Sequence, residues 1–205
     1  MVLLTQMTNT RTLWIVLGIV ILLLLGAFTG YNGLVGAKET VEAQWAQVET
    51  QYQRRVDLVP NLIETVKGAV KFEQSTLQAV TEARTRWLNA RSAARDEQIA
   101  AAGALDGALA RLLVTVENYP QLQAVQAFRD LQAQLEGTEN RVAVARRDYN
   151  EAVRAYNVRT KTFPGAIIAR LFGFIPENFF EAAEGAEQAP RVNFTGTPAA
   201  SSGPQ

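Results

Sequence analysis

Four polar side chains recur along one stretch of this sequence at a spacing that a helix would bring to one side. The four, spaced seven, four and seven residues apart, are Glu139, Arg146, Asn150 and Asn157. At 100° per residue they agree in direction within about 40°, which predicts a polar column beside an apolar stripe. Such a column could line a binding groove, but we favour ion pairs and amide hydrogen bonds that fix the register of packed helices. The partners expected on preceding helices are Arg54, Arg55, Glu64 and Lys67.

The composition narrows the chemistry that these side chains can perform. The 205 residues contain no cysteine and no histidine, so the chain lacks thiolates and the commonest general base and metal ligand. Twenty basic residues balance twenty acidic ones, and a zero net charge provides no basic field for nucleic acid. We therefore expect no catalytic activity, no cofactor, no metal site and no nucleic-acid partner. The alternative within the enzymes is a hydrolase that uses Asp or Glu with a recruited metal.

An apolar run at residues 13–28 precedes all of these residues. With the next two residues the uncharged run is ~27 Å long as a helix, close to the ~30 Å hydrocarbon core of a bilayer. It predicts a single membrane-spanning helix at 13–30 behind a short flank at 1–12. The location is therefore a cell membrane, with the lipid bilayer as a partner. Basic residues flank the run on both sides, so the side of the soluble domain stays open.

Two further features of the run concern processing and assembly. A cleaved signal peptide is the alternative to an anchor, although Ala27-Phe28-Thr29 is a poor cleavage site. Gly26 and Gly30 match the small-xxx-small pattern of helix contacts in membranes. This pair predicts a contact between membrane helices and hence a homo-oligomer.

Apolar residues at helical spacing predict further helices after the run. Their predicted bounds are 31–56, 57–93, 96–118 and 124–161. We expect a break or kink just before Pro60, with Asp57 capping a second helix whose first turn contains this proline and Asp96 capping the third helix. Short connections between long amphipathic helices favour antiparallel neighbours. Residues 31–163 are therefore predicted to form an all-α antiparallel bundle.

The bundle is followed by an apolar segment at 164–181 and a tail at 182–205. Drawn as a helix, the segment brings five apolar residues to one face: Ile168, Leu171, Phe172, Ile175 and Phe179. This face could lie in the membrane interface, or it could cover the end of the bundle as a hydrophobic lid. The tail is rich in Ala, Glu, Gly, Pro and Ser, and we expect it to be disordered.

Several motifs, in order along the chain, resemble those of the LemA family. They are Tyr31-Asn32, QRRVDLVPNLIETVKG at 53–68, ENYPQL at 117–122, LEGTENRVAVARRDYNEAVRAYN at 135–157 and Phe163-Pro164. The resemblance covers about 31–181 and implies an N-terminal membrane helix, an antiparallel helical bundle and no established enzymatic activity. Two positions depart from the family pattern. Phe72 stands where the family often has His, and Val125 where it often has Asn.

These observations favour a protein that acts by interaction. The prediction is a membrane-anchored helical-bundle scaffold or partner-binding protein without catalytic activity, which self-associates and binds a protein partner that the sequence does not identify. A membrane-remodelling protein that uses the apolar C-terminal segment is the alternative.

Overall fold

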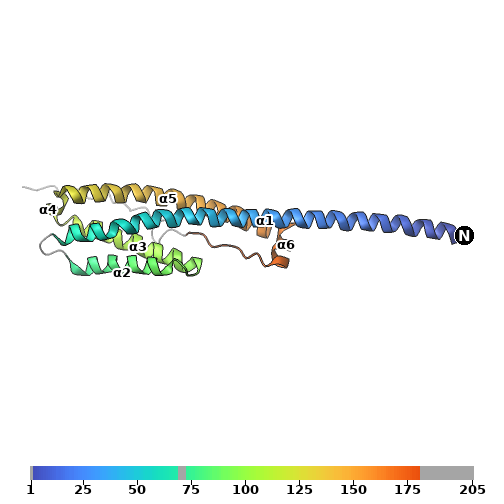
Figure 1. Cartoon of the computed structure of the whole chain (residues 1–205), viewed down its shortest axis with the longest axis horizontal. Coiled ribbons are helices and arrows are strands. Elements are labelled where there is room, and N and C mark those ends of the chain that lie inside the picture. The colour runs from blue at the N-terminus through green and yellow to red at the C-terminus, as the bar shows by residue number, and fades with distance from the viewer. Residues whose placement is uncertain (1, 69–72, 181–205) are drawn as a thin grey trace, which may run out of the picture.

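One long helix, α1, organises the fold. The computed structural model describes residues 2–68 and 73–180, with side chains from Thr12 onward, and within these residues all regular structure is helical (Figure 1). Helix α1 spans Val2–Lys67, 66 residues, or ~99 Å. The others are α2 (Gln74–Ala90), α3 (Arg95–Val116), α4 (Pro120–Gln123), α5 (Gln126–Lys161) and α6 (Gly165–Phe172). The predicted class, a long apolar helix ahead of packed helices, is confirmed.

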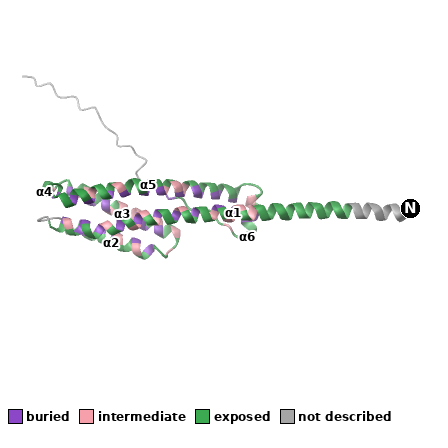
Figure 2. Cartoon of the chain, turned by 45° about the horizontal axis from the view of Figure 1, so that its top comes forward, coloured by how far each residue is buried: buried purple, intermediate pink, exposed green. Residues whose placement is uncertain are grey.

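The N-terminal part of α1, which we call the apolar arm (residues 12–29), stands apart from the bundle. Nearly every side chain of the arm is exposed, as the green ribbon in Figure 2 shows. Among the described helices, α1 and α3 are both long and apolar enough to cross a membrane. A third of the apolar window of α3 is buried in the bundle, whereas none of the window in α1 is. The arm is therefore the segment that indicates membrane anchoring.

The bundle is built on the antiparallel pair of α1 and α5, and the α2–α3 hairpin packs beside it. From residue 31 onward α1 extends ~55 Å away from the arm. The lengths of α2 and α3, which run in opposite directions, nearly cancel, and α5 runs ~54 Å back toward the arm. These lengths bring the end of α5 back to the base of the apolar arm. There α6 contacts both α1 and α5.

The predicted break at Pro60 is wrong, because α1 continues through this residue. Proline has no N–H, so the carbonyl of Val56, one turn earlier, loses its helical donor. Arg84 of α2 supplies a substitute, since its Nε donates to that carbonyl at 3.4 Å. Burial offsets the remaining cost, because Val56 and Val59 are both fully buried on the apolar stripe. Helix α2 consequently begins at Gln74, not at residue 57.

Neither predicted aspartate acts as a helix cap. Asp57 lies inside α1, and its carboxylate accepts a hydrogen bond from Gln53 at 2.8 Å. Asp96 lies in the first turn of α3, whose N-cap is Ala94. A carboxylate in a first turn still interacts favourably with the helix dipole. The Asp96 carboxylate also accepts a hydrogen bond from Asn178 at 2.8 Å, so it joins α3 to the C-terminal part of the chain.

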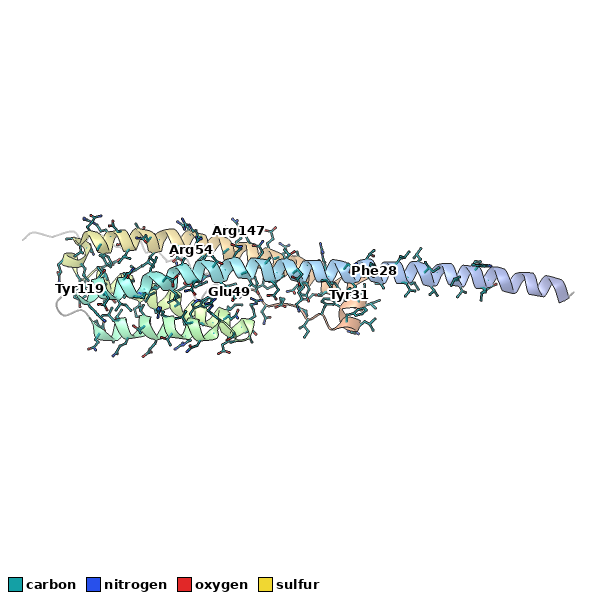
Figure 3. The ribbon with its side chains drawn as sticks, in the orientation of Figure 1. Phe28, Tyr31, Glu49, Arg54, Tyr119 and Arg147 are labelled. Atoms are coloured by element: carbon teal, nitrogen blue, oxygen red, sulfur yellow. The ribbon has the colours of Figure 1, made fainter. Side chains whose placement is uncertain are left out.

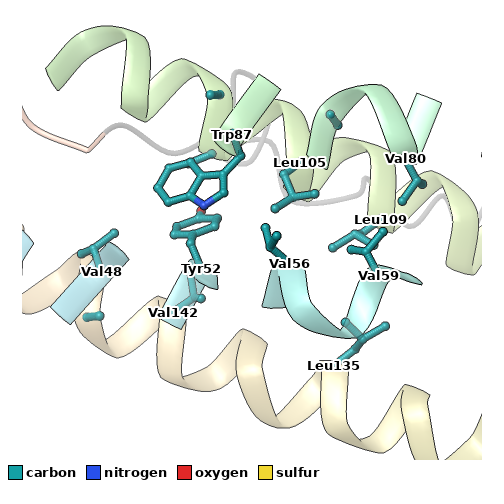
Figure 4. Close-up of a cluster of buried hydrophobic side chains, with 14 of the residues drawn as sticks. Val48, Tyr52, Val56, Val59, Val80, Trp87, Leu105, Leu109, Leu135 and Val142 are labelled. Atoms are coloured by element: carbon teal, nitrogen blue, oxygen red, sulfur yellow. The ribbon is translucent and has the colours of Figure 1, made fainter. Parts of the chain in front are cut away.

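The core lies where α1 faces α2, α3 and α5 at once (Figure 4). The apolar stripe of α1, formed by residues three or four positions apart, is buried as a whole and consists of Val41, Trp45, Val48, Tyr52, Val56 and Val59. The rings of Tyr52 and Trp87 lie 4.8 Å apart at its centre. Because all of these residues come from positions three or four apart, helical periodicity alone accounts for this part of the core.

The segment after α5 is only partly helical. Helix α6 ends at Phe172, and Gly173 follows with φ +74°, a left-handed conformation that favours glycine at a helix end. Residues 174–180, which we call the strap, then run as non-helical chain back along α5. A single helix through this segment is therefore wrong beyond Phe172. The tail predicted at 182–205 and Phe72 lie outside the described residues.

Candidate functional site

Two asparagines of α5 hold the backbone of the strap with both atoms of their amide groups. Asn157 Nδ2 donates to the Glu177 carbonyl at 2.8 Å, and the Glu177 N–H donates to Asn157 Oδ1 at 2.9 Å. Asn150 repeats the arrangement on Phe180, where its Nδ2 donates at 2.9 Å and its Oδ1 accepts at 2.7 Å. Each asparagine therefore satisfies the N–H and the C=O of one strap residue, as a neighbouring strand would.

A tyrosine precedes each of these asparagines and extends the row. The Tyr156 hydroxyl donates to the Ile175 carbonyl and the Tyr149 hydroxyl to the Asn178 carbonyl, both at 2.9 Å. Burial raises the pKa of Tyr149 to about 12 and also raises the pKa of Tyr156. Both phenols therefore stay protonated at neutral pH and remain donors. We call these four residues the Tyr–Asn row.

The spacing of the row matches the spacing of an extended chain. Seven residues of helix separate the two asparagines, a rise of ~10.5 Å. Three residues separate the two strap positions that they hold, and an extended chain covers ~10 Å in three residues. The strap runs antiparallel to α5, because Ile175 meets Tyr156 while Phe180 meets Asn150. Because the spacings match, both Tyr–Asn pairs can form the same hydrogen bonds to the strap backbone with the same geometry.

The strap ends in the core at Phe180, which is 5% exposed. Its ring stacks on Trp45 at 6.3 Å and on Tyr52 at 6.4 Å between centroids. The guanidinium of Arg146 lies over the same ring, 4.3 Å from its centroid. An aromatic face beside a partly desolvated cation is an attractive arrangement, so this site adds an aromatic anchor to the backbone contacts.

An ion-pair network adjoins the anchor and joins α1, α3 and α5 around the buried side chain of Arg55. Arg55, which is 2% exposed, pairs with Asp106 of α3 and with Glu139 of α5. Arg146 pairs with the other oxygen of Asp106. The Tyr52 hydroxyl donates to that same oxygen at 2.7 Å. The buried guanidinium of Arg55 thus has two carboxylate partners, while the side chains of Asp106 and Arg146 are 23% and 24% exposed and that of Glu139 is 66% exposed.

Burial favours the uncharged forms of two ionisable groups in the network. Burial raises the pKa of Asp106 to about 7, against the lowering effect of the Arg55 charge. Burial likewise lowers the pKa of Arg146 to about 10. A cavity of about 520 Å³ opens beside Asp106 and Arg55, lined mainly by apolar residues of α3 and α5. Within the described residues, no group of three or more acidic, histidine or cysteine side chains is placed to hold a metal.

Comparison with known proteins places this arrangement in a family. Residues 44–194 match the sequence profile of the LemA family, a range that holds every residue of the Tyr–Asn row and the network. The chain belongs to the LemA family. The apolar arm lies outside the match, which begins in the buried part of α1. The LemA resemblance identified from the sequence motifs is thereby confirmed.

Two magnetosome proteins are relatives of this LemA family chain. Magnetosome protein MamQ 2 of Paramagnetospirillum magneticum (strain AMB-1) is 27% identical over 175 residues, which cover 74% of this chain and 64% of the relative. Magnetosome protein MamQ of Magnetospirillum gryphiswaldense (strain MSR-1) is 24% identical over 174 residues, covering 73% and 64% respectively. The chain thus spans about 64% of the length of these relatives.

The structure divides the polar column predicted on α5 of this LemA family chain into two halves. Glu139 and Arg146 belong to the ion-pair network, and Asn150 and Asn157 hold the strap. Of the four expected partners, Arg55 is the one whose ion pairs reach the column within the described residues. Glu64 and Lys67 instead pair with each other on the surface at 2.8 Å; Arg54 lines a separate surface pocket with Asp57.

Sequence reasoning missed four members of this site, which are Asp106, Tyr149, Tyr156 and Phe180. Asp106 lies alone in an otherwise apolar part of α3, and a single acid at a buried position was a usable signal. The Tyr–Asn pair repeats at an interval of seven residues, which also marks one face of a helix. Phe180 carried no comparable signal, because it follows another phenylalanine in an irregular segment.

The two glycines predicted for a transmembrane contact have different surroundings. A Cβ at Gly30 would lie 2.3 Å from Cδ1 of Ile168, so α6 of the same chain already covers this glycine. Gly26 has nothing within 4 Å of such an atom and is open. Close approach of α6 to α1 therefore accounts for the glycine at position 30, and Gly26 alone of this pair keeps an open face for another helix.

The apolar face predicted for the segment at 164–181 is also divided. Ile168 is 5% exposed and packs beside Leu34 of α1, as a lid residue would. The other four residues of that face are exposed and are Leu171, Phe172, Ile175 and Phe179. Figure 3 shows Tyr31 of α1 close to α6, with Phe28 farther along the arm. The exposed part of the segment thus lies beside the base of the apolar arm.

Proposed function

We propose that this LemA family chain is a membrane-anchored scaffold that acts by binding proteins, including further copies of itself, and not by catalysis. The observation that carries the proposal is the continuity of α1. One unbroken helix contains the fully exposed apolar arm and the buried stripe of the bundle. A bundle joined to its anchor without a flexible linker is held at a fixed height and direction above the bilayer.

The polar residues of the bundle support a binding role over a catalytic one. General acid–base work requires a carboxylate that is free to reach a substrate. Asp106 has both oxygens in contact with Arg55, Arg146 or Tyr52, and Glu139 is paired with Arg55. The asparagines of the column contact backbone atoms of the strap. These groups are therefore committed to structural contacts.

The anchor and the self-association are tested separately. The full chain in its native membrane should resist extraction by carbonate and by high salt, and release by either treatment would contradict the anchor.

For self-association, Gly26→Ile should weaken the oligomers seen in mild detergent, because the added side chain separates helices that meet at Gly26. Gly18→Ile is the matched control, since Gly18 is equally open but lies about 80° around the helix. Equal loss in both variants, or in neither, would contradict a contact at Gly26.

The second candidate function, contact of α6 with the bilayer to remodel it, is favoured by one observation. Phe163, Ile167, Leu171 and Ile175 are between 62% and 83% exposed, close to the end of the apolar arm. Because the chain has no cysteine, Leu171→Cys can carry a single environment-sensitive fluorophore in the full chain on liposomes. We expect quenching by spin-labelled lipids there and none at Val144→Cys, an exposed site on α5. Equal quenching at both sites would contradict the contact.

A further inference from the structure

The Tyr–Asn row recognises the strap mainly through atoms that every polypeptide possesses. All six of its hydrogen bonds go to backbone N–H or C=O groups of the strap. A side-chain amide that pairs with both backbone groups of one residue selects for an extended conformation. These contacts therefore fix the conformation and direction of the bound chain, and leave most of its side chains free.

Selectivity comes from two side-chain positions of the strap. Phe180 fills the space between Trp45, Tyr52 and Arg146, and Asn178 donates to Asp96 of α3. The class of ligand is therefore an extended segment with a buried aromatic residue, preceded two positions earlier by a residue that donates a hydrogen bond. The sequence FIPENFF at 174–180 has this chemistry, and every copy of the chain carries it.

The strap is joined to the rest of the chain in a way that permits exchange. Its first residue is held at α6 by the hydrogen bond from Phe174 N–H to the Ala169 carbonyl. From Ile175 onward, the hydrogen bonds found within the described residues involve side chains of other elements or of the strap itself. The same contacts would form with the strap of a neighbour, so exchange changes few contacts and depends on the local concentration of the neighbour.

A shared bilayer places the neighbouring strap at the right height. Because α1 is continuous, the Tyr–Asn rows of two anchored copies stand at equal distances from the membrane. We propose that the Tyr–Asn row is a binding site for an extended polypeptide segment, and that it takes residues 175–180 of a second copy in exchange for its own. This inference rests on the proposed anchored, self-associating function.

Cysteine crosslinking of full-length chains in liposomes tests the exchange. The Oδ1 of Asp96 and the Nδ2 of Asn178 lie 2.8 Å apart, and the natural chain has no cysteine, so Asp96→Cys and Asn178→Cys create a defined pair. A chain with both substitutions should form an intrachain link with a short bifunctional maleimide. A mixture of the two single variants should form a covalent dimer. The control is a mixture of Asp96→Cys with Arg147→Cys, an exposed site on α5, which measures crosslinking by random collision. The dimer yield of the test mixture should be at least about ten times the yield of this control.

The outcomes separate this inference from the function on which it rests. Adding Asn150→Leu and Asn157→Leu to the Asp96→Cys chain should reduce the dimer yield to that of the collision control. A double variant that links only within its own chain, with no excess dimer from the mixture, would overturn the exchange. No link of either kind in the double variant, within one chain or between two chains, would overturn the site itself. Oligomers that persist by mass measurement in either case leave the proposed self-association in place, whereas their absence contradicts it.

Discussion

Replacing Phe180 by alanine tests whether the strap is part of the folded core. Phe180 is 5% exposed, and Phe→Ala at a buried site costs about 3–5 kcal/mol in unfolding free energy. Local detachment of the strap, with the helices intact, would limit this cost to the free energy with which the strap docks. We therefore expect Phe180→Ala to cost about 3 kcal/mol and to lower the melting temperature by roughly 10 °C.

Two measurements and one neighbouring residue make this prediction specific. Urea unfolding gives the free energy, and hydrogen exchange reports the Glu177 and Phe180 amides that donate to the two asparagines. Both amides should lose protection in Phe180→Ala, because the ring is the anchor of the strap. Phe179 is 44% exposed, so Phe179→Ala should cost less than about 0.5 kcal/mol. Equal costs at the two positions, or retained protection of both amides, would refute the assignment of Phe180 as the anchor.

Four further variants test other parts of the structure. Arg146→Ala leaves Asp106 short of a partner and the Phe180 ring without its cation, so the unfolding free energy should fall by ~1–3 kcal/mol in urea titrations. Because the folded pKa of Asp106 is raised to about 7, the folded state keeps a proton that the unfolded state releases above pH ~4. Wild-type stability should therefore decline by up to ~4 kcal/mol from pH 4 to 7, and the cost of Asp106→Asn should shrink over that range. Gly30→Ile should lower the melting temperature by displacing Ile168 of α6, with Gly18→Ile, at an equally open glycine of the arm, as the neutral control. Pro60→Ala should raise the melting temperature, because alanine restores the N–H that the helix lacks, and a decrease would contradict the account of Pro60.

Helical periodicity predicted most of the bundle. The buried stripe of α1, the bounds of α5 within two residues at its start, and the long apolar helix all follow from patterns along a few turns. The exception within the bundle is Pro60, where a local rule gave way to tertiary contacts. A donor from Arg84 and the full burial of Val56 lie in the folded molecule and leave no mark near the proline in the sequence.

The candidate site was harder to predict because its halves are far apart in the chain. The polar column on α5 was visible from spacing alone. Its division between an ion-pair network and the strap depends on Asp106, about 40 residues earlier, and on residues 20 to 30 positions later. The strap also contains no periodic pattern, since its conformation comes from partner amides and not from its own side chains. The local signs that the helix ends there are Gly173 and, three residues later, Pro176.

Because α1 is continuous, a change in the tilt of the apolar arm changes the tilt of the whole bundle. With the apolar arm held in a bilayer, the far end of the bundle lies ~55 Å from the membrane boundary along the same rigid helix. A change of ~10° in the tilt of the arm would displace that end sideways by ~10 Å, and tilts of this size accompany small differences in bilayer thickness. The end of α1 at Lys67 would then move farthest, while α6, beside the base of the arm, would hardly move. Bilayer thickness would in this way set how far apart the outer ends of two neighbouring copies stand.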